Sequence, residues 1–148
     1  MRAFPILALT VALVASALSL NVSAEPRAVP LYQVIVNPSN PTVTLDRSFL
    51  EDAFLKKISH WPSDQVIRPV DLESGSRTRR AFSEYVLRRA VDAVKGYWQQ
   101  RIFSGRDVPP PELDTDDDVI KYVLKYEGAV GYVSGAAGLN GAKVVTVR

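Results

Sequence analysis

The chain has 148 residues, carries a formal net charge of +2 and contains no cysteine. The near balance of charge argues against a nucleic-acid partner attracted by net charge. The absence of cysteine excludes disulfides, thiolate metal ligands and a cysteine nucleophile. We therefore expect a domain that is stabilised by its hydrophobic core and has no cofactor.

Residues 1–24 have the layout of a secretory signal peptide. A single positive charge at Arg2 precedes an apolar run over residues 4–20, and the small-residue sequence Val-Ser-Ala ends at Ala24. A membrane anchor is the alternative, but the apolar run is shorter than a full span. We expect cleavage after Ala24 and a mature single domain over residues 25–148.

The first half of that domain predicts a strand, a helix and a second strand. Residues 32–36 are rich in valine and isoleucine and predict a strand buried on both faces. Apolar residues recur at helical spacing after Thr44, which can cap a helix that ends near two lysines. Residues 66–70 predict a strand that Pro69 limits to a short or edge position.

Two helices are predicted over residues 76–105. Phe82 and Tyr85 lie on one helical face, but the same phase would place Arg89 in the middle of that face. We therefore expect a break near residues 88–90 and a second helix whose apolar face includes Val94, Trp98 and Ile102.

The last third of the chain opens with a proline-rich connector at residues 105–112. The next helix has a Thr115 cap, three aspartates in its first turn and Gly128 as its stop, in accord with the helix dipole. Two β-rich segments, 129–135 and 142–148, predict strands joined by a flexible turn. The complete pattern indicates an α/β fold in which about four helices cover a small mixed sheet.

The segment "DLESGSRTRRAF" is the best candidate for a binding site. A glycine permits a tight turn, Ser76 or Thr78 can cap the helix that follows, and the first backbone N–H groups of the helix attract anions. Three arginines there oppose the helix dipole, which a bound anion would explain. The candidate residues are Gly75, Ser76, Arg77, Thr78 and Arg79.

Simpler interpretations of these residues exist. Ser76 or Thr78 could act only as a cap, with the arginines solvated or paired with Glu73 and Glu84. His60 is the only histidine, so neither a histidine metal cluster nor a serine hydrolase triad is favoured. The aspartates near Thr115 lack the rest of a calcium loop. We expect neither an enzyme nor a metal site.

Five segments follow one another along the chain: "VIVNPSNP", "LDRSFLEDAFLKKISHWP", "RPVDLESGSRTRRAF", "YWQQRIFSGR" and "GAVGYV". In this order they resemble one lobe of the phosphate-type periplasmic solute-binding proteins of ABC transporters. The resemblance covers nearly all of residues 25–148. It implies a single lobe of the type II periplasmic-binding-protein fold, a periplasmic location and a role in transport.

In that family a Gly-Ser-Gly-Thr-Arg turn binds the oxyanion, which implies that Ser76, the backbone N–H of Arg77 and Thr78 would do so here. The chain departs from the pattern, because Arg77 replaces the second glycine and Leu72 stands where an anion-binding arginine usually lies. No segment resembles the opposing lobe. A single lobe without the opposing one implies weak phosphate or sulfate binding, with a dissociation constant of about 1 mM or somewhat tighter.

Two functions remain open from the sequence. The first is an exported binding module with weak oxyanion recognition, completed by a second copy or a partner. The second is an interaction module that kept the lobe, lost the ligand and meets an acidic periplasmic protein through exposed arginines. An uncovered lobe face favours a homodimer or a bound protein partner. We expect no nucleic acid and no membrane span after signal cleavage.

Overall fold

The computed structural model describes residues 26–148, so the predicted signal peptide lies outside the described residues. Within residues 26–148 the fold is α/β, as the sequence predicts. In this part of the chain, no helix is both long and apolar enough to cross a membrane. The helical elements are α1 (Arg47–Phe54), α2 (Arg77–Phe82), the π-helical turn η1 (Ser83–Leu87), α3 (Val91–Phe103) and α4 (Asp116–Lys125).

The main sheet is mixed and has the strand order β2-β7-β1-β6-β3. Strand β1 is antiparallel to both β6 and β7, whereas β2 and β3 are parallel to their neighbours at the two edges. Strands β4 and β5 form a separate parallel pair. The strands are β1 (Gln33–Val36), β2 (Thr44–Leu45), β3 (Arg68–Pro69), β4 (Asp71–Leu72), β5 (Glu112–Leu113), β6 (Ala129–Val133) and β7 (Lys143–Val147).

The strand predictions agree with the structure, including the edge position expected from Pro69, but the expected cap of the first helix is wrong. Pro69 lies in β3 at the sheet edge, where a missing N–H breaks no central ladder. Thr44 does not cap α1, because it belongs to β2 and pairs with Thr146 of β7. Asp46 occupies the cap position of α1 instead.

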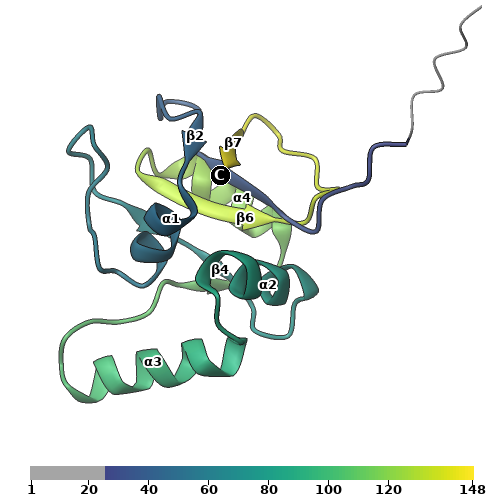
Figure 1. Ribbon diagram of the computed structural model, residues 1–148. Coiled ribbons are helices and arrows are strands. Elements are labelled where there is room, and N and C mark those ends of the chain that lie inside the picture. Colours follow the sequence, from purple (N-terminus) through teal and green to yellow (C-terminus); the bar gives the residue numbers. More distant parts are fainter. Residues whose placement is uncertain (1–25) are drawn as a thin grey trace, which may run out of the picture.

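Helices cover both faces of the main sheet. Figure 1 shows α1 and α2 on one face and α4 on the other. Strand β6 is buried along its whole length. Gly131 of this strand allows α4 to pack closely, because a Cβ atom at this position would lie only 2.8 Å from the side chains of Val119 and Val70. The resulting core joins the inner face of α4 to the aromatic side chains that lie under α1 and α2.

The predicted break between two helices is confirmed. Helix α2 passes directly into η1, and Arg88 then adopts a left-handed conformation with φ of 52° before α3 begins. The wider π-helical turn changes which side chains face inward. Val86 and Leu87 are buried, whereas Tyr85, expected on the inner face, is 59% exposed.

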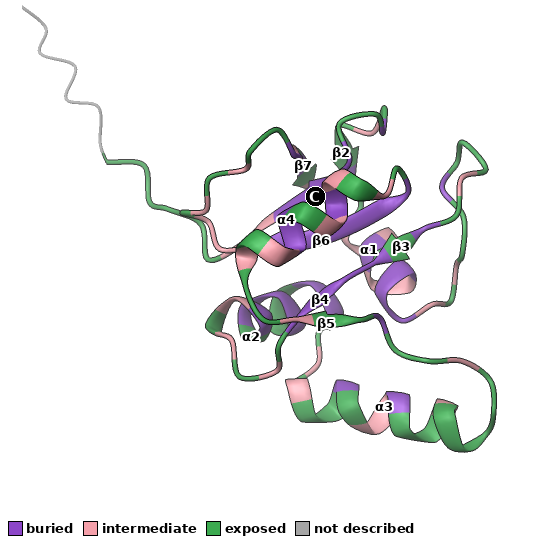
Figure 2. Ribbon diagram, turned by 180° about the vertical axis from the view of Figure 1, so that it is seen from behind, coloured by how far each residue is buried: buried purple, intermediate pink, exposed green. Residues whose placement is uncertain are grey.

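Helix α3 extends away from the sheet. It lies apart from the other helices in Figure 1, and most of its surface is exposed in Figure 2. Val94 and Trp98 are buried as expected, but Ile102 is exposed and the side chain of Phe103 is 92% exposed. The apolar face of α3 is therefore only partly covered within the described chain.

The extended segment Val29–Leu31 packs against the loop that follows β6. Gly135 allows this close approach, because a Cβ on Gly135 would overlap the carbonyl oxygen of Pro30. Gly138 lies in the same loop, and a Cβ there would meet nothing within 4 Å. The two glycines therefore differ in what surrounds them, and only Gly135 is needed for the position of the segment.

Replacing Gly135 with alanine is expected to displace the segment Val29–Leu31 from the loop, since Pro30 and the new methyl group cannot occupy the same space. The Gly138→Ala variant is the matched control. Amide spectra of the two variants should show large shifts at residues 29–33 for Gly135→Ala alone. Equal shifts in both variants would contradict this packing.

Candidate functional site

The turn before α2 is held by two local hydrogen bonds. The hydroxyl of Ser76 accepts from the N–H of Arg79 at 3.2 Å, so Ser76, and not Thr78, is the cap. The carboxylate of Glu73 accepts from the N–H of Gly75 at 3.1 Å. Both groups are thus already engaged inside the turn, and φ of Gly75 lies outside the left-handed range that would require glycine.

Arg79 points inward, contrary to the expectation that the arginines of this stretch are exposed. Its side chain is 2% exposed, and its Nη1 lies 2.8 Å from Oδ1 of Asp71. The same nitrogen donates to the carbonyl of Leu72 at 3.0 Å, and Nη2 lies 3.9 Å from Glu112. The Arg79 guanidinium therefore attaches α2 to β4 and β5 instead of facing solvent.

Tyr132 of β6 completes this buried group. Its hydroxyl donates to Asp71 at 2.8 Å and accepts from the N–H of Leu72 at 3.2 Å, and its ring stacks on Phe82 at 3.8 Å. We call Asp71, Arg79 and Tyr132 the buried triad. It connects three elements, α2, β4 and β6, by polar contacts inside the core.

Burial changes the ionisation of each member of the buried triad. Burial raises the pKa of Asp71 to about 6, although Arg79 and the Tyr132 hydroxyl act in the opposite direction. Burial alone would lower the pKa of Arg79, but its interactions with Asp71, Tyr132 and Glu112 together outweigh burial and raise that pKa. Burial and then the charge of Asp71 raise the pKa of Tyr132, so its hydroxyl keeps the proton that it donates.

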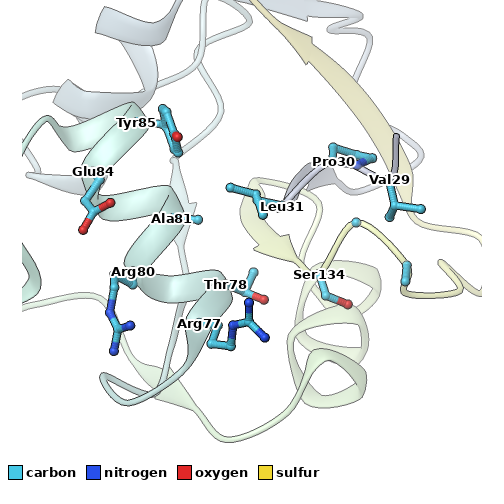
Figure 3. A pocket seen from close by; sticks show the side chains of 12 residues that line it. Val29, Pro30, Leu31, Arg77, Thr78, Arg80, Ala81, Glu84, Tyr85 and Ser134 are labelled. Atoms are coloured by element: carbon cyan, nitrogen blue, oxygen red, sulfur yellow. The ribbon is translucent and has the colours of Figure 1, made fainter. Parts of the chain in front are cut away.

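Arg77 and Thr78 line a different space, on the outer side of α2. This open pocket has a volume of about 460 Å³ and lies between α2, the segment Val29–Leu31 and the loop after β6. Figure 3 shows Arg77 and Thr78 between the start of α2 and Ser134. Of the five residues predicted from the sequence, these two line the pocket, whereas Gly75, Ser76 and Arg79 do not.

The pocket has a positive end. Arg77 and Arg80 are exposed, and within residues 26–148 no carboxylate forms an ion pair with either of them, so the suggested pairing with Glu73 and Glu84 is not formed. Glu84 lines the same pocket and offsets part of this charge. The pocket can therefore attract a small anion by side-chain charge.

Ser134 lines the pocket, but it contributes less to the binding of an anion than this position suggests. Its hydroxyl donates to Asp116 at 2.6 Å and its N–H points to the same carboxylate at 3.2 Å. Both donors are therefore used within the protein, next to the start of α4. In the described part of the chain, no group of three or more histidine, cysteine, aspartate or glutamate side chains could hold a metal ion.

Several solved structures that share this fold are described as phosphate transport or phosphate-binding proteins. An ABC-type phosphate transport receptor from Vibrio cholerae matches with a TM-score of 0.61, 21% identity and 78% coverage of this chain. A putative phosphate ABC transporter substrate-binding protein from Clostridium perfringens, with bound phosphate, matches with a TM-score of 0.62, 26% identity and 78% coverage. A possible phosphate-binding protein from Planctomyces limnophilus matches with a TM-score of 0.56, 20% identity and 79% coverage of this chain.

The chain matches lobes of these proteins. It covers 45%, 44% and 41% of the three structures, in the same order, and so spans less than half of their length. No family model matches the chain, and no curated protein matches it either. The comparisons thus support the α/β fold of a single lobe that the sequence resembles.

The buried triad was not predicted from the sequence, although one signal was present. Arg79 precedes Phe82 by three residues, and this spacing places both side chains on the same helical face. Because Phe82 was expected to face inward, Arg79 had to face inward as well. Its partners could not be found in this way, since Asp71 and Tyr132 lie 61 positions apart in the sequence.

The raised pKa of Asp71 predicts an effect of pH on stability. Between about pH 4, where a free aspartate titrates, and about pH 6, the unfolded chain has lost this proton while the folded chain retains it. The Asp71 contribution to the free energy of unfolding is therefore fully present below about pH 4 and is lost by about pH 6, a fall of about 3 kcal/mol.

Other carboxylates titrate in the same range, so the measurement is a comparison. Unfolding in urea, followed from pH 4 to pH 7 for the unaltered protein and for Asp71→Asn, isolates the contribution of Asp71. The stability advantage of the unaltered protein should shrink as pH rises. An advantage that is constant across this range would contradict the raised pKa.

Proposed function

We propose that the protein is an exported, single-lobe binding module that recognises phosphate or a similar oxyanion in the pocket beside α2. The observation that carries this proposal is the pair of exposed arginines, Arg77 and Arg80, on one pocket wall without acidic partners among residues 26–148. Thr78 adds a hydroxyl on the same side of α2. We therefore place the anion next to Arg77 and Thr78.

The buried triad supports this assignment by fixing how α2 lies. Because Arg79 is held underneath the helix by Asp71, the residues on either side of it in the sequence are turned outward. The guanidinium of Arg79 is not a ligand in this proposal, and Ser76 contributes by capping α2. The bound phosphate named for the Clostridium perfringens structure gives the chemistry of the ligand.

The proposed binding is weak. The pocket is open, has no opposing lobe within the described chain, and offers the anion one or two exposed arginines and a hydroxyl. Such contacts correspond to a dissociation constant of about 1 mM. Secretion through residues 1–24 would place the domain in the periplasm, where a transporter or a second lobe could complete the site.

The test is a titration with inorganic phosphate, and then sulfate, followed in the amide spectrum at constant ionic strength. Saturable shifts at residues 77–81 are expected. Arg77→Ala should weaken binding about tenfold, because it removes a charge-assisted hydrogen bond. Arg106→Ala, which removes an exposed arginine outside the pocket, is the matched control and should have no effect.

An amide spectrum that does not change on addition of either anion would contradict the proposal. Equal weakening by Arg77→Ala and Arg106→Ala would show only general attraction of anions to a basic protein. Arg79→Ala is not a suitable test, because it would leave Asp71 buried without its partner and destabilise the fold.

An interaction module is the second candidate. It is favoured by the exposed apolar residues at the end of α3 and in the loop after it, where Phe103 is 92%, Ile102 51% and Val108 61% exposed. Exposed groups of this kind mark surfaces that contact other proteins. Anion titrations without saturable shifts, together with a protein partner that Phe103→Ala releases, would favour this candidate.

A further inference from the structure

The pocket beside α2 is much larger than inorganic phosphate requires. Its volume is about 460 Å³, whereas a water molecule takes about 30 Å³ of liquid and a phosphate ion is only a few times larger. A phosphate held by Arg77 and Thr78 would therefore occupy one end of the pocket and leave the remainder to solvent.

The unused end of the pocket is apolar. It is formed by Leu31 of the N-terminal segment and by Ala81 and Tyr85 of α2 and η1. Figure 3 shows Leu31, Ala81 and Tyr85 together, away from Arg77 and Ser134. Leu31 and Tyr85 are 60% and 59% exposed, although large apolar residues are usually buried.

The apolar surface continues beyond the pocket. An adjoining groove of about 520 Å³ shares Pro30, Leu31 and Tyr85 with the pocket and is otherwise lined mainly by the side chains of β1 and β7. Val144 of β7 is 43% exposed there. A molecule bound at Arg77 could thus extend over Leu31 and Tyr85 without meeting a charged side chain in the groove.

We infer that the ligand is a phosphate monoester with an apolar or aromatic group, rather than inorganic phosphate. This inference rests on the proposed function, because it uses the same anion position at Arg77 and Thr78. Three phosphoryl oxygens remain for Arg77 and Thr78, and the fourth carries the organic group towards Leu31 and Tyr85. The combination of a positive end and an apolar end in one pocket matches this chemistry.

The experiment compares four compounds by amide titration of the protein at constant pH and ionic strength. They are inorganic phosphate, glycerol 3-phosphate, phenyl phosphate and phenol. Phenyl phosphate should bind about tenfold more tightly than inorganic phosphate, because its ring covers part of the exposed apolar surface. Glycerol 3-phosphate should resemble inorganic phosphate, and phenol should bind more weakly than phenyl phosphate.

Two variants test which residue contacts the phosphate group of the ligand and which contacts its apolar group. Tyr85→Ala should reduce phenyl phosphate binding to the level of inorganic phosphate and leave inorganic phosphate unchanged. Arg77→Ala should weaken both phosphates. Phe103→Ala, which removes another exposed aromatic side chain far from this pocket, should change neither. Tyr85 is exposed, so its replacement should preserve the dispersed spectrum of the folded protein.

The outcomes separate this inference from the proposed function. Equal affinities for inorganic and phenyl phosphate, insensitive to Tyr85→Ala, would overturn the inference and retain the phosphate site. Saturable shifts with neither phosphate would overturn both. Phenol that binds as tightly as phenyl phosphate, without an effect of Arg77→Ala, would show an apolar pocket without anion recognition and would also overturn both.

Discussion

The contact between Asp71 and Arg79 is the constraint on which the candidate site depends. Both side chains are almost fully buried, and their atoms approach to 2.8 Å. Removing one partner of such a pair typically costs about 3 to 5 kcal/mol, because the other charge is left in the core. Tyr132 supports the pair from β6 and stacks on Phe82 of α2. Helix α2 is thereby attached to the strands by polar contacts of Arg79 and by the aromatic contact of Phe82.

This arrangement gives neighbouring arginines different tasks. A short helix turns by about 100° per residue, so a residue fixed beneath the helix leaves those before and after it on the outside. Arg79 is held against β4, and Arg77 and Arg80 lie on the exposed side of α2, where both line the open pocket. Three positive charges at a helix start are unfavourable for the helix dipole. One of them stabilises the fold, and the other two are available for the proposed binding of an anion.

Local sequence patterns predicted most of the fold. The Thr115 cap, the acidic first turn and the spacing of apolar residues specify α4, and the structure confirms each of them. The phase conflict at Arg89 correctly located the break after η1. Thr44 was misassigned because a capping residue and an edge-strand residue look alike without knowledge of β7, its partner far along the chain.

The site was only partly predictable for the same reason. Ser76 as a cap and Arg77 with Thr78 at the helix start follow from local chemistry. The inward direction of Arg79 depends on Asp71 and Tyr132, and the pocket depends on the approach of Pro30 to Gly135. These contacts join residues that are distant in sequence, so they cannot be predicted from the spacing of residues within a single segment. The identity of the ligand depends on both ends of that pocket.

The most direct test of this account is amide hydrogen exchange in the double variant Asp71→Asn, Arg79→Met, which removes both charges and so leaves no unpaired charge in the core. If the buried triad holds α2 in place, amides of residues 79–83 should exchange far faster than in the unaltered protein, while amides of β1 and β6 remain protected. Unchanged protection of α2 would contradict the account, because the helix would then be positioned without the Asp71–Arg79 contact.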